Sequence, residues 1–143
     1  MNTSVTYSKD QAQSRTGLRA SLWVVQILLA GMFGMAGWMK ATVPLAELAQ
    51  KLPWVTSLPT LTRFIGICEL AGAIGLIVPA ITRILPKLTP LAASGLVAIM
   101  LLAIPFHISR GEIGVLGIPL TLGALAAFVA WGRFRAAPIS SRK

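Results

Sequence analysis

Residues 61–81 read LTRFIGICELAGAIGLIVPAI, and this apolar run decides the fold. It holds only two charged residues, Arg63 and Glu69. As a helix it is long enough to cross a hydrocarbon core of about 30 Å, which takes roughly 20 residues. Because a segment in lipid must satisfy its own backbone hydrogen bonds, a helix is the structure that such a run favours. The stretch therefore predicts a transmembrane helix.

Three further runs have the same character and extend the prediction to the whole chain. They are residues 21–39, 89–108 and 113–132. Hydrophobic residues make up 55% of the sequence and charged residues 12%, against about 25% charged in an average soluble domain. The runs are too long and too unbroken for barrel strands, which show about ten residues of alternating character. We predict an all-α polytopic membrane protein, a four-transmembrane-helix bundle.

Residues 18–135 form one membrane domain in this interpretation, with a short segment on each side of it. Residues 1–17 are polar and predict a mobile tail, and residues 136–143 predict a basic tail. The first span follows basic residues, as a secretory signal does, but it runs on to Met39 without a clear small-x-small cleavage site. We therefore expect it to be retained.

Residues 41–60 form the only long connection between the predicted spans. Leu45, Leu48 and Leu52 recur at helical spacing, which favours a short amphipathic helix on the outer surface. Trp54 would then lie at the level of the lipid headgroups. An irregular loop, broken by Pro53 and Pro59, fits the same residues equally well.

The basic residues predict the orientation. Nine of the thirteen fall on the side that carries both termini, and an excess of Lys and Arg marks the cytoplasmic side. They are Lys9, Arg15, Arg19, Arg83, Lys87, Arg133, Arg135, Arg142 and Lys143. We expect a multi-pass protein of the cell inner or plasma membrane with both termini in the cytoplasm. The net charge of +9 is explained by these short loops and tails facing the lipid bilayer, and no recognition motif suggests nucleic acid.

The ionisable residues within or beside the spans all map to the outer half of the bundle. They are Lys40, Arg63, Glu69, His107, Arg110 and Glu112, and the inner half of the spans holds none. Glu69 is the costly one, because a carboxyl group at depth is penalised by several kcal/mol unless it has a partner or a proton.

Helical geometry identifies partners for Glu69. At 100° per residue, Gly66 and Gly72 share its face, so that a neighbouring helix can approach closely. On the first span, Gln26, Ala30, Phe33, Gly37 and Lys40 form a matching stripe. We therefore predict that Gly37, Gly66 and Gly72 serve helix packing, and that Lys40 contacts Glu69. His107 is a second candidate partner, whereas Arg63 and Arg110 can extend toward water.

Two interpretations of this group remain open. Lys40, Glu69, His107 and Arg110 are candidates for ligand binding or a proton relay, because intramembrane carboxylates are functional by default. The alternative is an interhelical clamp, since polar contacts often hold membrane helices together. Kinks at Pro79 and Pro105 would shape the bundle around them.

Several kinds of chemistry find no support in the sequence. A single cysteine, Cys68, excludes an internal disulfide, and one histidine cannot give bis-histidine haem ligation. No cluster of Cys, His and carboxylates has metal-binding spacing, and there is no phosphate-binding loop. We predict no metal and no covalently bound cofactor, and assign no catalytic residue.

The residues assembled above resemble the DoxX-like family of small four-helix membrane proteins. Span one ends Gly37-Trp-Met-Lys40, and span two reads Gly66-Ile-Cys-Glu-Leu-Ala-Gly72 with Pro79 following, which resembles the family's G-x-x-E-L-x-G helix. Ala103 and His107 close span three, and residues 131–133 (Trp-Gly-Arg) close span four. The resemblance covers about residues 20–135.

The chain departs from this pattern at one position. Many relatives carry an asparagine at the start of the last helix, whereas the only asparagine here is Asn2. If that asparagine completes a polar site in the relatives, Glu112 or Thr121 would replace it in this chain.

Some members of the family are linked to quinone-coupled sulfur oxidation or to oxidative-stress assemblies. The resemblance therefore implies a redox-associated subunit that binds a quinone or lipid at a polar site in the outer half of the bundle, beside a membrane or periplasmic redox partner. A small-solute or proton-coupled transporter is a second hypothesis, although four spans are few unless the chain forms a homo-oligomer. A non-catalytic membrane scaffold is the third.

Overall fold

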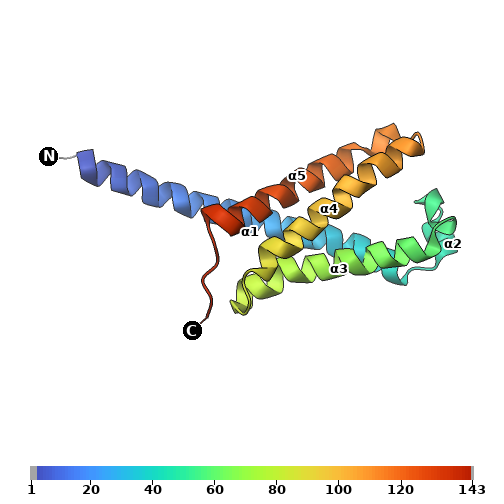
Figure 1. The fold of residues 1–143 in the computed structure, drawn as a ribbon, viewed down its shortest axis with the longest axis horizontal. Coiled ribbons are helices and arrows are strands. Elements are labelled where there is room, and N and C mark those ends of the chain that lie inside the picture. Colours follow the sequence, from blue (N-terminus) through green and yellow to red (C-terminus); the bar gives the residue numbers. More distant parts are fainter. Residues whose placement is uncertain (1–2, 143) are drawn as a thin grey trace.

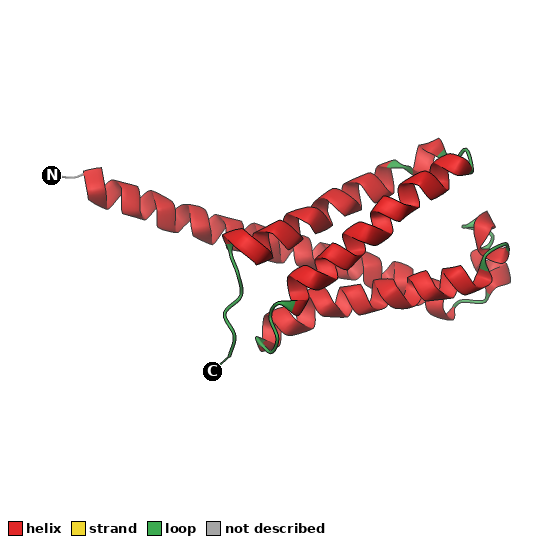
Figure 2. Cartoon of the chain, viewed as in Figure 1, coloured by secondary structure: helices red, strands yellow, loops and turns green. Residues whose placement is uncertain are grey.

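The protein is a bundle of four long helices in the computed structural model, which describes the backbone of residues 3–142 and the side chains of residues 15–142. The long helices are α1 (Thr3–Thr42), α3 (Pro59–Thr82), α4 (Leu88–Ser109) and α5 (Gly117–Trp131). Short elements connect or follow them: α2 (Leu45–Leu48), η1 (Pro53–Thr56), η2 (Ile113–Val115) and the π-helical turn η3 (Gly132–Ala136). Figure 2 shows helices joined by short loops, with a loop at the C-terminal end and no strand among the described residues.

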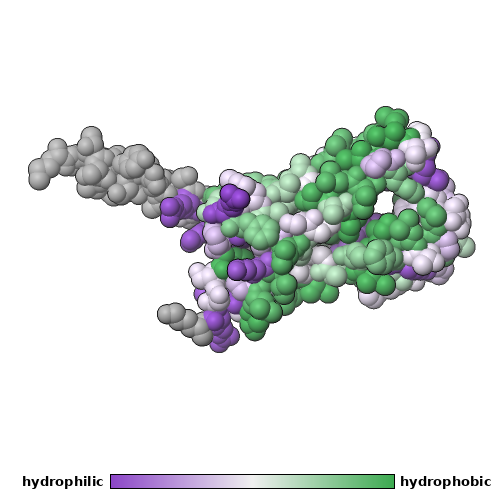
Figure 3. Space-filling view, viewed as in Figure 1, coloured by the Kyte–Doolittle hydropathy of each residue, from purple (hydrophilic) through white to green (hydrophobic). Residues whose placement is uncertain are grey.

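Four segments are long and apolar enough to cross a membrane, as the sequence predicts. They are Arg15–Thr42, Pro59–Thr82, Leu88–Ser109 and Ile113–Ala136. Their outward side chains are large and apolar, and Ile67, Leu102 and Ile118 are each at least 60% exposed. The green surface of Figure 3 shows this apolar belt. The four-helix membrane fold is therefore confirmed, because four apolar helices of spanning length with outward apolar side chains suit a lipid surrounding.

The helices pack in the order α1, α3, α4, α5, with α5 returning to α1. In Figure 1 the α1/α3 pair and the α4/α5 pair lie close together near the termini and diverge toward the far end. We call the end with residues 83–87 and 137–142 the terminal end, and the end with residues 43–58 and 110–116 the loop end. Figure 3 shows an opening between the two helix pairs near the loop end.

Two hydrophobic clusters hold the bundle together. The larger one fills the centre and the terminal end and contains Leu22, Leu29, Phe33, Leu76, Leu96 and Ala126. The smaller one lies at the loop end, where Leu48, Trp54 and Val55 pack against Met39, Val43 and Phe106. Residues 43–58 thereby fill part of the space between the diverging helix pairs.

The start of α1 and the connection that follows its end differ from the prediction made from the sequence. α1 begins at Thr3, so the helix continues through the segment for which a polar tail is predicted. The mobility of that tail stays a prediction, and residues 1 and 2 lie outside the described residues. Beyond α1, the expected amphipathic helix is reduced to the single turn of α2, and Pro53 begins a separate turn, η1. The connection therefore combines features of both interpretations, a short helix and a proline-broken loop.

Candidate functional site

The Lys40–Glu69 contact predicted from the helical faces is present. Lys40 Nζ lies 2.7 Å from each carboxylate oxygen of Glu69, across the interface of α1 and α3. The side chain of Glu69 is 3% exposed and that of Lys40 is 15% exposed. Each charge therefore has an opposite charge in hydrogen-bonding contact, which is the condition for burying both.

Glycines explain how the two helices come close enough for this contact. A Cβ on Gly37 would lie 2.7 Å from the carbonyl oxygen of Gly66, and one on Gly66 would lie 2.8 Å from Cβ of Lys40. Gly72 likewise receives the side chain of Leu96 from α4. All three glycines therefore lie at contacts between helices; a larger residue at Gly37 or Gly66 would meet the backbone of the neighbouring helix, and one at Gly72 would displace the side chain of Leu96.

Arg63 has a different role from the one expected. The sequence predicts that it competes for Glu69 or extends toward water. Instead its guanidinium donates to the carbonyl oxygens of Lys40, at 2.6 Å, and Val43, at 2.8 Å. These carbonyls belong to the last turn of α1 and the residue after it, where no helical N–H remains to bond them. Arg63 therefore ties the end of α1 to α3 beside the ion pair.

His107 and Arg110 form a second polar group on the other helix pair. His107 Nδ1 lies 2.6 Å from one carboxylate oxygen of Glu112, and Arg110 Nε donates to the other at 3.0 Å. The hydrogen bond with His107, followed by that with Arg110, holds the pKa of Glu112 below its ordinary value. Glu112, which the sequence suggests as a replacement for the family asparagine, is thus within the polar group, whereas Thr121 is exposed.

The two polar groups are not joined directly. No hydrogen bond between His107 and Glu69 occurs among the described side chains, so the expectation of His107 as a partner for Glu69 was wrong. The reason lies in the fold: α4 diverges from α3 toward the loop end (Figure 1), and His107 bonds Glu112 across its own turn. The candidate site therefore has two walls, with Lys40 and Glu69 on one and His107 and Arg110 on the other.

Trp54 connects these walls, and sequence reasoning places it elsewhere. The expected position is the headgroup level of an exposed loop, but Trp54 is 6% exposed and packs edge-on against Phe106 at 5.2 Å. Phe106 in turn contacts the ring of His107 and lies under the guanidinium of Arg110. The indole N–H of Trp54 is buried without an acceptor. In the sequence, only the position of Trp54 between Pro53 and Pro59 marks it as unusual. The residues that it contacts are seen only in the tertiary fold.

A buried polar contact at the terminal end corrects another prediction. The sequence predicts no ionisable group in the inner half of the bundle and places Arg133 beyond the last span. Arg133 is 5% exposed, and its Nε donates to Oε1 of Gln26 at 2.6 Å. Gln26 Nε2 donates onward to the carbonyl oxygen of Leu76 at 2.8 Å. The π-helical turn η3 begins one residue before Arg133 and carries this side chain back against α1.

The polar groups described above do not include a candidate metal centre. Among the side chains of residues 15–142, no three His, Cys, Asp or Glu residues lie close enough to hold a metal ion. The loop end has hydrogen-bond donors surrounded by apolar side chains. Such an arrangement can orient a ligand by bonding its acceptor atoms.

Comparison with known protein families matches residues 24–129 to the DoxX-like family. The matched region contains the Lys40–Glu69 pair, Trp54 and the His107–Glu112 group. No curated protein and no solved structure gives a significant match to the chain. Since the family match covers most of the sequence and agrees with the four-helix fold, this chain belongs to the DoxX-like family.

Proposed function

We propose that this protein is a membrane subunit that binds the carbonyl head group of a quinone, or of a lipid with similar acceptors, at the loop end of the bundle. The observation that carries the proposal is the buried indole N–H of Trp54, which has no acceptor in the protein. An unpaired buried donor costs about 1–3 kcal/mol. A ligand that supplies an acceptor removes that cost, so the donor favours a bound carbonyl oxygen.

The neighbouring polar groups suit a head group that carries two oxygens, as a quinone and its reduced form do. Lys40 has three N–H bonds, and its two bonds to Glu69 leave the third. His107 uses Nδ1 in its contact with Glu112, so in the neutral ring that donates there Nε2 is an acceptor, suited to the hydroxyl group of a reduced head group. Figure 3 shows an opening between the helix pairs near the loop end, and the apolar cluster of Leu48, Trp54 and Val55 at that end would cover part of an isoprenoid tail.

Glu69 acts in this proposal by positioning Lys40. Both of its oxygens bond the ammonium group, so the positive charge stays at a fixed place within the bundle. An ammonium N–H near a quinone oxygen would stabilise the negative charge that develops when the quinone is reduced. Arg110 would hold the carboxylate of Glu112, and through it the ring of His107.

The distribution of basic residues supports an orientation for this site. If the excess of Lys and Arg marks the cytoplasmic side, the loop end would lie on the outer side of the inner or plasma membrane. A membrane or periplasmic redox protein is then the partner that would exchange electrons with the bound quinone. This orientation is testable with a reporter fused to the C-terminus.

Quinone binding by matched tryptophan variants tests the proposal. Trp54→Phe keeps an aromatic ring against Phe106 but removes the unpaired N–H, whereas Trp38→Phe changes a tryptophan that is 61% exposed at the same end. We expect the affinity of purified protein for decylubiquinone, measured by equilibrium dialysis, to fall about tenfold in Trp54→Phe, equivalent to about 1.4 kcal/mol. Trp38→Phe should bind like the wild type.

Two results would overturn the proposal. One is a Trp54→Phe variant whose quinone affinity equals that of the wild type. The other is a wild-type protein that does not bind the quinone at all while Glu69→Gln still lowers its thermal stability. That second result would favour the scaffold interpretation, in which the Lys40–Glu69 pair is only a clamp.

A further inference from the structure

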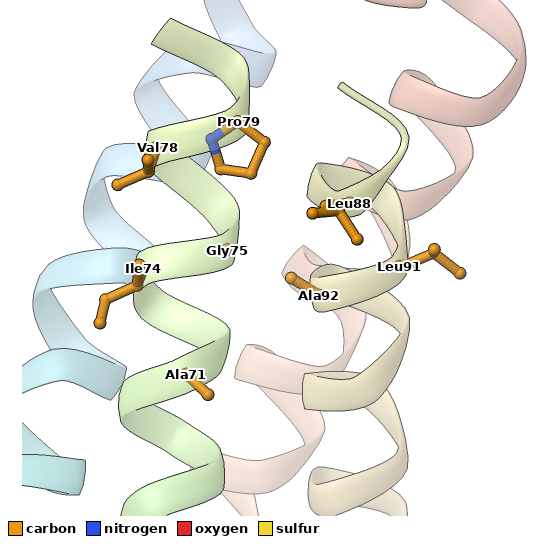
Figure 4. A pocket seen from close by; sticks show the side chains of 8 residues that line it. All are labelled: Ala71, Ile74, Gly75, Val78, Pro79, Leu88, Leu91 and Ala92. Carbon is orange, nitrogen blue, oxygen red and sulfur yellow. The ribbon is translucent and has the colours of Figure 1, made fainter. Parts of the chain in front are cut away.

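A second site lies at the opposite end of the molecule, in a groove between α3 and α4. The groove has a volume of about 570 Å³ and is lined by apolar side chains alone. Figure 4 shows Gly75 and Ala92 where the two helices approach each other, with Ile74, Val78 and Leu91 beside them. A Cβ on Gly75 would lie 2.6 Å from Cβ of Ala92, so these small residues close the floor of the groove.

The groove and the turn that follows it together have about the length of one bilayer leaflet. The groove extends along α3 from Ala71 to Pro79, and Arg83 follows one turn later. The eight helical steps from Ala71 to Pro79 rise about 12 Å, and the four further steps to Arg83 bring the total to about 18 Å, whereas half of a hydrocarbon core is about 15 Å. The groove together with the turn that follows it would therefore extend from the membrane surface at the terminal end to near the middle of the bilayer, which is the depth of a single acyl chain.

Positive charge gathers where the groove meets the membrane surface. Arg83 and Lys87 are both exposed in the turn between α3 and α4. The backbone N–H of Arg142 donates to the carbonyl oxygen of Arg83 at 3.1 Å, which brings a third basic residue to this turn. Of the chain's four acidic residues, Glu47, Glu69 and Glu112 belong to the loop end or its approach, so none of these three offsets the charge.

The turn itself holds a conformation that ordinary residues seldom adopt. Arg83 has φ of 60° and Leu85 has φ of 47°, both in the left-handed region. A residue other than glycine costs free energy in this conformation, and it persists there only where the surrounding structure fixes it. Ile84 and Leu85 are more than 60% exposed, and Leu88 lines the groove, so apolar side chains surround the basic ones at the level of the membrane surface.

We infer that the α3–α4 groove binds an anionic phospholipid, with one acyl chain along Ala71, Gly75 and Ala92 and its phosphate near Arg83 and Lys87. The charge decides between this occupant and a second copy of the chain. A two-fold contact through the groove would bring the two basic turns together without an acid between them, whereas a phosphate neutralises one turn. This site is independent of the quinone proposed for the loop end.

Lipid binding by the purified full-length chain tests the inference. The protein in detergent is titrated with phosphatidylglycerol or with phosphatidylcholine of the same acyl chains, and bound lipid is measured by native mass spectrometry. We expect about tenfold tighter binding of phosphatidylglycerol. The double variant Arg83→Gln/Lys87→Gln should lose most of that preference, whereas Arg135→Gln, an exposed basic residue of η3 at the same end, should keep it.

A second pair of variants tests the groove apart from the charge. Ala71→Phe fills the groove from an exposed position on α3, and Ala127→Phe adds the same volume at an exposed position on α5. We expect Ala71→Phe to weaken phosphatidylglycerol binding severalfold and Ala127→Phe to leave it unchanged. Equal binding of the two lipids by the wild type would overturn the inference. So would a lipid-free dimer that Ala71→Phe dissociates, because a second copy would then occupy the groove.

Discussion

The two ends of the bundle bury charged side chains in different ways. At the loop end, Lys40 and Glu69 carry opposite charges, and both oxygens of the carboxylate are bonded. At the terminal end, Arg133 is 5% exposed and is bonded only to neutral acceptors, Oε1 of Gln26 and the carbonyl oxygen of Ala137. The ring of Trp23 lies 5.3 Å from the guanidinium carbon and adds a cation–π contact.

This difference matters because the contribution of a buried charge to stability depends on whether its partner is also charged, and not only on the length of the hydrogen bond. Loss of one partner from the loop-end pair leaves an isolated charge in the bundle, which is strongly unfavourable. Loss of Arg133 removes the only charge of its group and leaves a neutral amide oxygen without its donor. We therefore expect the two ends to respond unequally to similar substitutions.

Lys40→Met should have the largest effect on stability. It keeps an unbranched side chain of similar length but leaves Glu69 buried without a cation, so the free energy of unfolding should fall by about 3–5 kcal/mol. Denaturation of the purified protein in a fixed detergent measures this. Lys51→Met, at an exposed lysine of the same end, should change stability by less than about 0.5 kcal/mol. Equal stabilities for the two variants would show that the pair contributes nothing.

Gly37→Ala should have the next largest effect, because it separates α1 from α3, the two helices that carry Lys40 and Glu69. The added methyl group would lie 2.7 Å from the carbonyl oxygen of Gly66 and 2.8 Å from the backbone nitrogen of Leu70. Backbone atoms cannot move aside as a side chain can, so we expect a loss of about 1–3 kcal/mol.

Gly31→Ala is the matched control for that substitution. Nothing lies within 4 Å of a Cβ at Gly31, on the same helix. Alanine there should raise stability by about 0.5–1 kcal/mol, because it favours the helix more than glycine does. If both alanines stabilised the protein, the close approach of α1 and α3 would not be needed.

Arg133→Met should lower the free energy of unfolding by about 1 kcal/mol, which is less than the loss expected for Lys40→Met. The substitution breaks the bond to Gln26, but it also removes a desolvated charge that has no acid beside it, and the two effects oppose each other. Arg135→Met, at an exposed arginine two residues further on, is the control. A loss as large as that of Lys40→Met would contradict the comparison between the two ends. A double-mutant cycle with Gln26→Leu measures the coupling directly.

The contrast between the two ends also explains what the sequence could predict. The Lys40–Glu69 contact follows from two continuous helices, whose faces are fixed by 100° per residue and whose depths are fixed by the membrane. The four spans and the positions of the packing glycines follow from the same regularity. Helical periodicity and span length are therefore sufficient to predict these parts of the fold.

The remaining contacts depend on places where the regularity ends. Arg133 follows the last predicted span and reads as a tail residue, but the π-helical turn directs it to Gln26. His107 bonds Glu112 across a turn whose backbone the sequence does not determine. Trp54 is buried because α4 diverges and leaves room beside Phe106. Turn geometry and helix divergence are tertiary properties, and periodicity holds no information about them.

The smallest effect is expected at Glu112, which lies at the surface end of the His107 group. Its pKa is lowered, mainly by the hydrogen bond with His107, so the ionised form is the one that stabilises the fold. That contribution is complete above the ordinary carboxyl pKa of 4.5 and is lost as the pH falls through the lowered value. The difference in Tm between the wild type and Glu112→Gln should therefore be constant near neutral pH and shrink below about pH 4.5.

The matched control for this measurement is Glu47→Gln, at an exposed glutamate of the same end. It should have a Tm close to that of the wild type across the same range, because no cation is bonded to Glu47 among the described side chains. A Tm difference for Glu112→Gln that persists unchanged to pH 3 would mean that the charge of Glu112 is not what holds His107. The loop end would then depend on the Lys40–Glu69 wall alone, since the opposite wall would lack an ionic contact that fixes its imidazole.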